Sequence, residues 1–406
     1  MLDSMEIVEY TRHVADLDIL EVSSTWSFWD RPVPASVPRD VDLPEALRDS
    51  LCLAIQGVRR CGKSTLLQQL IDHYRLDPAH CALLNLEDPR LSGAQSYATL
   101  DRLVEGFRER HESGETLYFF LDEIQGVEGW QRWLRAQLDR PRGNVFVITG
   151  SNARLLSGEL SSVLTGRHLT VELFPFDLDE MRRSDPHATL EDYLSDGGFP
   201  EPLTMADGDR LRRQYFHDIV ERDVRERIGA RSSAAIRQVV QMVYEAAGSE
   251  TSLRRVAGAT GIAVDTAGSY LEACEAAYLL FACPYFTFSE RKRASRNRKY
   301  YPIDTGLRQV VVTRGGADRG KSLECATYLA LRRRYGEVAY WRDDGEVDFV
   351  VRVNGRIVPV QVTWAEPVDR HQRALERFYE RYPQADEAAF VTAARFEDAL
   401  SAIGEA

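Results

Sequence analysis

The chain of 406 residues has 44% apolar and 28% charged side chains, a composition typical of folded globular proteins that excludes the disordered and fibrous classes. At about 150 residues per domain, this length predicts two or three domains. The 63 acidic residues outnumber the 51 basic ones, and the net charge of −12 argues against a protein covered on all sides by nucleic acid or anionic lipid. Only four of the basic residues are lysines: Lys63, Lys292, Lys299 and Lys321.

The sequence carries no signal for a membrane or for an oxidising compartment. No apolar run is long enough to span a bilayer, and the acidic N-terminus lacks the apolar core of a signal peptide. We therefore expect a cytoplasmic protein with no membrane partner. None of the six cysteines forms a CxxC pair, so we expect reduced, mostly buried thiols rather than a zinc site or a disulfide framework.

The first half of the chain alternates short apolar runs with helical patterns. Residues 1–50 are expected to form an irregular lead-in, whose Pro- and aromatic-rich segment 26–38 lies against the next domain. Beyond it, short β-rich runs separated by helices predict a mostly parallel, three-layer α/β sheet. The helical spacing of Trp130, Trp133, Leu134 and Leu138 predicts the core face of one helix. The expected strands are 51–55, 81–86, 117–121, 144–150 and 169–174.

A phosphate-binding loop follows the first of these strands. Residues 57–64 read GxxxxGKS and stand between the strand LCLAI and a helix that begins STLLQQL. Glycines let the backbone N–H groups turn towards phosphate oxygens, and the helix N-terminus favours negative charge. We expect Lys63 to neutralise the β- and γ-phosphates and Ser64 to hold Mg²⁺. The residues expected to bind the nucleotide are Gly57, Arg59, Arg60, Cys61, Gly62, Lys63, Ser64 and Thr65.

Two carboxylates, Asp122 and Glu123, follow the buried strand YFFL. Open parallel sheets bind ligands at the carboxyl ends of their strands. We therefore expect Asp122 to hold Mg²⁺ through water and Glu123 to polarise the attacking water.

Two further catalytic candidates come later in the chain. Asn152 or Ser151, after the strand NVFVI, can orient the water or contact the γ-phosphate, although either residue can equally cap a helix. Arg167 precedes the strand LTVELF and is a candidate arginine finger towards the nucleotide of a neighbouring subunit. Arg154 is its rival, and with so many arginines in the chain a surface role is as good an interpretation.

An ordered set of motifs resembles a known family. GVRRCGKSTLL, FLDEIQ, TGSNARLLS, TGRHLTVELFPF, GGFPE and YYPIDTGL are similar to motifs of the archaeal-type AAA-family ATPases that carry a C-terminal domain of unknown function. The resemblance implies an AAA+-like P-loop core, a helical lid, a winged-helix-like module and a C-terminal fold similar to PD-(D/E)xK nucleases. The expected boundaries are 1–50 for the lead-in, 51–175 for the core, 176–230 for the lid, 231–318 for the winged-helix-like module and 319–406 for the nuclease-like domain.

The middle module has a helix–turn–helix layout over residues 251–281 and a local excess of positive charge. Residues 231–320 hold 13 basic and 8 acidic side chains, which suits contact with nucleic acid phosphates. The second helix, however, exposes only acidic charges, so we expect non-specific backbone contact at most. A protein-interaction module with a solvated basic loop is the alternative. The candidate DNA-contacting residues are Arg291, Lys292, Arg293, Arg296, Arg298 and Lys299.

The nuclease-like domain lacks part of the pattern that the resemblance requires. Glu324 on a helix and Asp348 on a strand match, and Glu346 could assist Asp348 as a metal ligand. The third element, however, has Gln361 and Thr363 in place of a carboxylate and a lysine. Gln offers a metal only a neutral oxygen, and Thr cannot replace an ammonium. Because the only nearby basic substitutes are Lys321 and Arg356, we expect an inactive, structural domain.

The sequence thus predicts a Mg²⁺-dependent, AAA+-like ATPase whose nucleotide state moves the lid and the winged-helix-like module against a DNA or protein partner. If Arg167 acts in trans, the active form is a homo-oligomer. One alternative is an NTP-gated switch with little turnover, and another is a metal-dependent DNA nuclease coupled to the ATPase.

Overall fold

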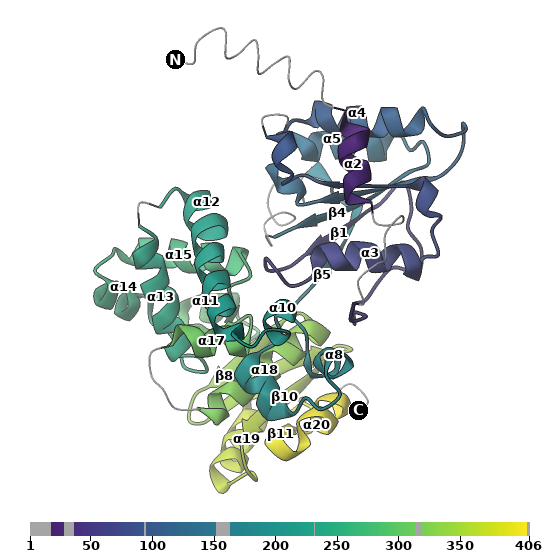
Figure 1. The fold of residues 1–406 in the computed structure, drawn as a ribbon. Helices are drawn as coiled ribbons and strands as arrows, with labels where there is room; N and C mark the ends of the chain where they lie inside the picture. Colours follow the sequence, from purple (N-terminus) through teal and green to yellow (C-terminus); the bar gives the residue numbers. More distant parts are fainter. Residues whose placement is uncertain are drawn as a thin grey trace. The chain divides into compact units, whose positions relative to one another are not determined.

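The computed structural model describes residues 18–27, 36–92, 95–151, 163–230, 232–312 and 318–403. The chain divides into two compact units (Figure 1). The first comprises residues 1–57 and 62–173, and the second comprises residues 58–61 and 174–406. No helix in these described ranges is both long and apolar enough to cross a membrane.

The first unit is built on a five-stranded sheet with the order β2-β3-β4-β1-β5, and every pair in it is parallel. The central strands are buried on both faces, which explains why they read as unbroken apolar runs. The prediction of a parallel α/β sheet is confirmed. The strands are β1 (Cys52–Gln56), β2 (Cys81–Asn85), β3 (Leu117–Asp122), β4 (Asn144–Gly150) and β5 (His168–Glu172).

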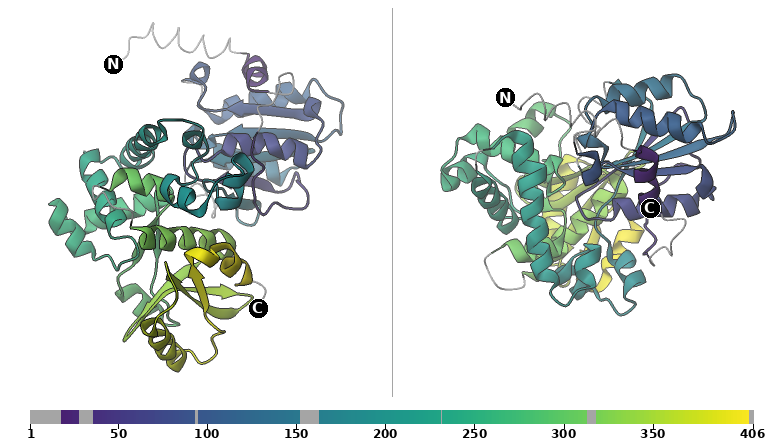
Figure 2. Two further views of the ribbon diagram at one scale, coloured as in Figure 1. Left: turned by 60° about the horizontal axis from the view of Figure 1, so that its bottom comes forward. Right: turned by 45° about the horizontal axis from the view of Figure 1, so that its top comes forward.

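Helices cover both faces of this sheet (Figures 1 and 2). On one face, α2 (Ile19–Trp26), α4 (Tyr97–Arg108) and α5 (Trp130–Asp139) share one apolar core with alternate strand residues such as Phe119 and Phe146. Helix α3 (Lys63–His73) lies on the other face and buries its leucines. The predicted core face of α5 is confirmed, because Trp130, Trp133, Leu134 and Leu138 are all buried.

Helix α2 corrects the expectation of an irregular lead-in. Asp18 caps it by accepting from the backbone N–H groups of Leu20 and Glu21, and Ile19 and Val22 enter the core of the sheet. Ser23 Oγ also donates to the carbonyl of Leu83 at 2.8 Å. Eight residues hold only two helical turns, so the apolar periodicity was too short to stand out in the sequence.

The second unit begins with a helical run. It contains α8 (Leu178–Ser184), α9 (Leu190–Asp196), α10 (Pro200–Leu203), α11 (Gly208–Asp218), a π-helical stretch at Ile219–Arg225 and α12 (Glu226–Ile228). Next come α13 (Ser233–Glu245), α14 (Leu253–Thr260) and α15 (Val264–Ala276), and then the antiparallel pair β6 (Leu280–Cys283) and β7 (Lys299–Pro302). The predicted order of helix, turn, helix and strands is therefore present. Between the strands, α16 (Glu290–Ser295) makes part of the expected basic loop helical, and α17 (Thr305–Val311) follows β7.

The C-terminal part is a smaller α/β element whose four-stranded mixed sheet has the order β11-β10-β9-β8. Its antiparallel strands are β8 (Val338–Arg342), β9 (Glu346–Val353) and β10 (Arg356–Thr363), and β11 (Ala389–Thr392) pairs in parallel with β10. The helices are α18 (Arg319–Tyr335), α19 (Asp369–Arg381) and α20 (Phe396–Ala402). The predicted second α/β unit is confirmed.

Asp304 joins two of the sequence motifs within the second unit. Its buried carboxylate accepts from the N–H groups of Gly198 and Leu307, both at 2.6 Å. The glycines of these motifs make the approach possible. A Cβ on Gly197 would lie 2.2 Å from Asp304 Oδ1, and one on Gly306 would lie 2.1 Å from the carbonyl of Asp196. The motifs GGFP (residues 197–200) and DTG (residues 304–306) therefore pack directly against each other.

We predict that Asp304→Ala lowers the free energy of unfolding of the second unit by about 2–3 kcal/mol, because two buried N–H groups lose their acceptor. Chemical denaturation followed by far-UV circular dichroism measures the change. The matched control is Glu191→Gln, an exposed carboxylate in the same unit, which we expect to cost less than about 0.5 kcal/mol. Equal unfolding curves for the two variants would contradict the assignment.

All six cysteines are buried, as expected, and the structure places none of them in a disulfide. Burial raises the pKa of Cys274 and of Cys325 to about 12. Because the thiolate is the reactive form, we predict that the folded protein reacts with a thiol reagent such as DTNB at least 100-fold more slowly than the protein in denaturant. Rapid labelling of even one thiol under native conditions would contradict this burial.

Candidate functional site

The loop between β1 and α3 has the geometry of a phosphate cradle. Strand β1 ends at Gln56 and helix α3 begins at Lys63. Within the loop, Gly62 has φ of 103° and Arg60 has φ of 71°, a left-handed conformation that turns the backbone sharply. The first amides of α3 therefore face the carboxyl end of the sheet, where the helix N-terminus favours an anion.

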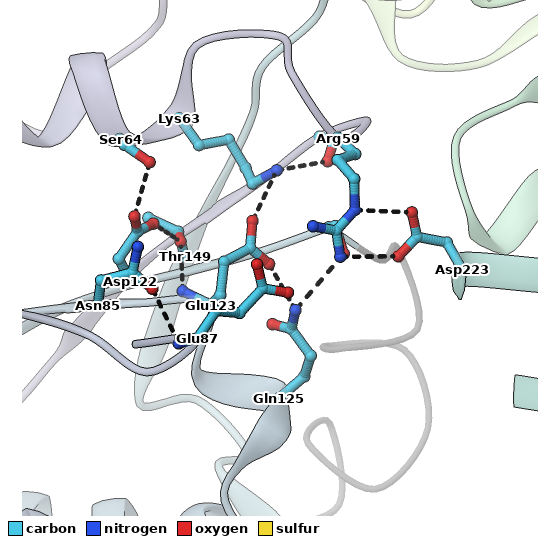
Figure 3. A network of polar contacts seen from close by, with 12 residues as sticks. Arg59, Lys63, Ser64, Asn85, Glu87, Asp122, Glu123, Gln125, Thr149 and Asp223 are labelled. Atoms are coloured by element: carbon cyan, nitrogen blue, oxygen red, sulfur yellow. Dashed lines mark hydrogen bonds and ion pairs between the residues drawn. The ribbon is translucent and has the colours of Figure 1, made fainter. Parts of the chain in front are cut away.

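Lys63 is buried, with only 4% of its surface exposed. Its Nζ donates to the carbonyl of Gly57 at 3.2 Å and lies 3.3 Å from Glu123 Oε1 (Figure 3). The ammonium is therefore held inside the loop rather than in solvent, at the place where a phosphate would need it. Its partner Glu123 supplies the counter-charge in this structure.

Asp122, the last residue of β3, is the centre of the site. Its Oδ2 accepts from Ser64 Oγ at 2.6 Å, and its Oδ1 accepts from Thr149 Oγ1 (Figure 3). Burial and the neighbouring Glu123 raise the pKa of Asp122, while the hydrogen bonds from Ser64 and Thr149 and the charge of Lys63 oppose that rise. Ser64 and Asp122, the two expected Mg²⁺ ligands, thus lie side by side, and their oxygens are the donors that Mg²⁺ prefers.

Glu123 stands where the chain leaves the sheet. Its φ of 54° is uncommon for a residue with a Cβ and turns the backbone away from the strand direction. Thr149 Oγ1 accepts from the Glu123 N–H at 2.9 Å, and Gln125 Nε2 donates to Glu123 Oε2 at 2.5 Å. The carboxylate is therefore fixed in position close to Lys63.

Thr149 on β4 is a positioning residue that the sequence analysis did not single out. One hydroxyl donates to the Asp122 side chain and accepts from the Glu123 backbone, so it fixes the carboxylate of Asp122 and the main chain of Glu123. The sequence feature that could have identified it is a hydroxyl-bearing residue near the end of the strand next to Asp122, and in the structure this threonine is buried. The alternatives preferred in the sequence were Ser151 and Asn152. Ser151 Oγ accepts from Gln125 at 3.5 Å, and Asn152 lies outside the described residues.

The other expected site residues are dispersed. Residues 58–61 group with the second unit, in which Arg59 Nε donates to Asp223 Oδ2 at 3.2 Å. Arg167 immediately precedes β5, at the amino ends of the strands, whereas the phosphate loop follows the carboxyl end of β1. It donates to the carbonyl of Leu138 at 2.7 Å and pairs with Asp139 at 2.8 Å. Arg167 is therefore no part of its own chain's site. Its rival Arg154 is outside the described part of the chain.

Lys299 requires a correction to the expected DNA-binding surface. It was grouped with five arginine and lysine neighbours as a phosphate contact, but its side chain is fully buried. Its Nζ lies 2.6 Å from Glu346 Oε1 and 3.7 Å from Glu324 Oε1. Strand β7 is buried along its whole length and begins at Lys299, whereas Arg298, just before the strand, is exposed. Lys292 and Arg296 pair with Asp343, so the basic segment is partly neutralised within the chain.

Three family models match consecutive stretches of the chain. An AAA domain covers residues 49–182, a domain of unknown function (DUF8612) covers 187–317, and a second one (DUF4143) covers 319–401. The AAA match contains all the residues of the site around Asp122. The other two matches carry no description of a function.

Similar proteins occur in bacteria and archaea. An uncharacterized protein of Haemophilus influenzae is 30% identical over 338 residues, which is 78% of this chain and 84% of that protein. An uncharacterized protein of Methanocaldococcus jannaschii is 29% identical over 345 residues, 78% of this chain and 75% of its own length. The solved structure of C. elegans PCH-2 aligns over 68% of this chain and 70% of its own, at 13% identity and a TM-score of 0.27, a likeness too weak to support any inference.

We predict that Lys63→Ala weakens nucleotide binding at least tenfold, because the buried ammonium is the cation of the phosphate cradle. Titration with a fluorescent ATP analogue measures the affinity. The control is Arg132→Ala, an exposed cation on α5 that we expect to leave the affinity unchanged. Equal affinities in wild type and Lys63→Ala would remove the phosphate-loop assignment.

Proposed function

Because the chain belongs to the same protein family as the Haemophilus influenzae relative and carries an AAA domain, we propose that it is a Mg²⁺-dependent ATPase that hydrolyses ATP at the loop of residues 57–64. The observation that carries the proposal is the convergence of Lys63, Ser64, Asp122 and Glu123 at one edge of a parallel sheet. The match to an AAA domain supports nucleotide binding in general. The dependence on Mg²⁺, the hydrolysis of ATP and the role of each residue go beyond that match and are part of the proposal.

Each residue of the site has a distinct task in this mechanism. The loop amides and Lys63 bind the β- and γ-phosphates and balance their charge. Ser64 and Asp122 would hold Mg²⁺, which when bound supplies positive charge to the phosphate oxygens. When the γ-phosphate takes Lys63 as its partner, the Glu123 carboxylate is released to accept a proton from the attacking water. Thr149 keeps Asp122 and Glu123 oriented throughout.

A partner, an oligomer and a cytoplasmic location also belong to this proposal. Six buried cysteines, none of them in a disulfide, fit a reducing compartment. The helix–turn–helix layout and the exposed Arg291 and Arg298 support a DNA or protein partner for residues 231–318, moved by the nucleotide state. A homo-oligomer with Arg167 acting in trans requires that this side chain leave Leu138 and Asp139, so the hydrolytic proposal does not depend on it.

We predict that Glu123→Gln slows steady-state ATP hydrolysis by about 10²–10⁴-fold and leaves ATP affinity within about threefold of wild type, since the amide keeps the shape but cannot take the proton. Phosphate release and nucleotide titration give the two quantities. The control is Glu128→Gln, an exposed carboxylate just beyond the site, which should retain full turnover.

Two results would overturn the hydrolytic mechanism. Turnover that is unchanged in Glu123→Gln would remove Glu123 as the base. Negligible turnover in the wild type, with nucleotide binding intact, would establish the NTP-gated switch instead.

A further inference from the structure

Phe288 is the most exposed large apolar side chain among the described residues, with 62% of its surface open to solvent. It lies on the loop between β6 and α16, within the second unit. The centroid of its ring is 5.8 Å from that of Phe286 and 5.6 Å from that of Tyr382, and both of these rings are buried. Edge contacts with buried rings therefore hold an aromatic ring at the surface, where it gains little from burial itself.

Exposed arginines from three different elements lie around this ring. The guanidinium of Arg352, on β9, lies over the ring of Phe288, with Cζ 5.9 Å from the centroid. Arg381 ends α19 and directly precedes Tyr382, and Arg291 follows Phe288 by three residues on α16. None of the three arginines forms an ion pair with a carboxylate in the described part of the chain. Their charges are therefore available to a ligand.

Two other basic side chains of the same segment have a structural task instead. Lys292 and Arg296 lie over the ring of Tyr285, at 5.1 and 4.7 Å from its centroid. Both also pair with Asp343, at 3.6 and 2.6 Å. These contacts fix the basic segment against the C-terminal sheet, because Asp343 directly follows strand β8. The positive charge that remains unmatched is that of the arginines around Phe288.

The acidic side chains of this region show which surface suits phosphate groups. On α15, the second helix of the helix–turn–helix layout, Asp265 and Glu272 are exposed, and they would repel phosphates on either side of a groove. On α16, by contrast, the exposed Glu290 lies 3.7 Å from Arg293, so its charge is partly matched. Nucleic acid is therefore favoured beside Phe288 and disfavoured along α15.

An exposed aromatic ring among unpaired cations is an arrangement that binds unpaired bases, because a base stacks on the ring while the cations contact the flanking phosphates. In a duplex the bases are already stacked on one another and offer the ring no free face. We propose that single-stranded DNA binds to the surface formed by Phe288 and the three arginines around it, which we call the stacking face. The inference rests on the DNA partner proposed for residues 231–318, and it extends that surface to Arg352 and Arg381.

Fluorescence anisotropy of the nucleotide-free full chain with a labelled oligothymidylate of about 20 nucleotides tests the proposal. We expect Phe288→Ala and Phe288→Leu each to weaken binding about tenfold, because leucine keeps an apolar side chain but has no aromatic face. Phe288→Trp should bind at least as tightly as the wild type. The matched control Tyr97→Ala removes an exposed aromatic side chain of the first unit and should leave the affinity unchanged.

The salt dependence of binding tests the arginines separately. Arg352→Gln removes one phosphate contact, so we expect the slope of log affinity against log salt concentration to fall by about 0.7 in magnitude. The control Arg210→Gln, an exposed arginine on α11, should keep the slope of the wild type. Each variant should retain its circular dichroism and its affinity for the ATP analogue, which depends on residues of the first unit.

Several outcomes would overturn the proposal. Equal affinities of wild type and Phe288→Leu would remove the stacking role, and equally tight binding of the duplex with oligoadenylate would remove the preference for a single strand. Tighter binding of oligouridylate would assign the face to RNA. Absence of binding by the wild type, together with self-association that Phe288→Ala abolishes, would assign it to a second copy of the chain. Phosphate release is measured separately, so that negligible ATP turnover with intact DNA binding would overturn the proposed hydrolysis alone.

Discussion

The side chain of Asp122 is the contact on which the phosphate site depends. One oxygen accepts from Ser64 on the helix that follows the loop, and the other accepts from Thr149 on the next strand. A single carboxylate thereby links β3, β4 and the start of α3 at the carboxyl edge of the sheet. The cost of burying it is met by these hydrogen bonds and by Lys63, and the same burial is what raises its pKa.

The parallel sheet could be predicted because its strands are buried on both faces. Unbroken apolar runs such as 117–121 and 144–150 have no other simple interpretation when helical patterns separate them. The order of motifs then placed Lys63, Ser64, Asp122 and Glu123 together, since carboxyl ends of parallel strands share one edge. Thr149 was passed over for its neighbours Ser151 and Asn152, because a single buried threonine in a strand carries no sequence signal that it orients other residues.

Lys299 shows the limit of reasoning from local sequence. Six basic residues within nine positions suggest a charged surface, and five of the six keep at least part of their side chains exposed. The sixth begins a short strand that is buried along its whole length, and it pairs with carboxylates that lie 25 and more residues further along the chain. The C-terminal part does lack a lysine on the strand that carries Gln361. The sequence of that part alone could not show that the ammonium of Lys299, from the preceding segment of the chain, lies beside its carboxylates.

The four lysines therefore fall into two pairs that differ in their environment. Lys63 and Lys299 are buried among carboxylates in different units, while Lys292 and Lys321 are partly exposed near the surface. Burying an ammonium is unfavourable unless its charge is matched, so each buried lysine requires acidic groups fixed around it. In the first unit that requirement is met by Glu123, which a phosphate can replace as the partner of Lys63. In the second unit it is met by Glu346, whose Oε1 lies 2.6 Å from the Lys299 ammonium, and by Glu324 at 3.7 Å.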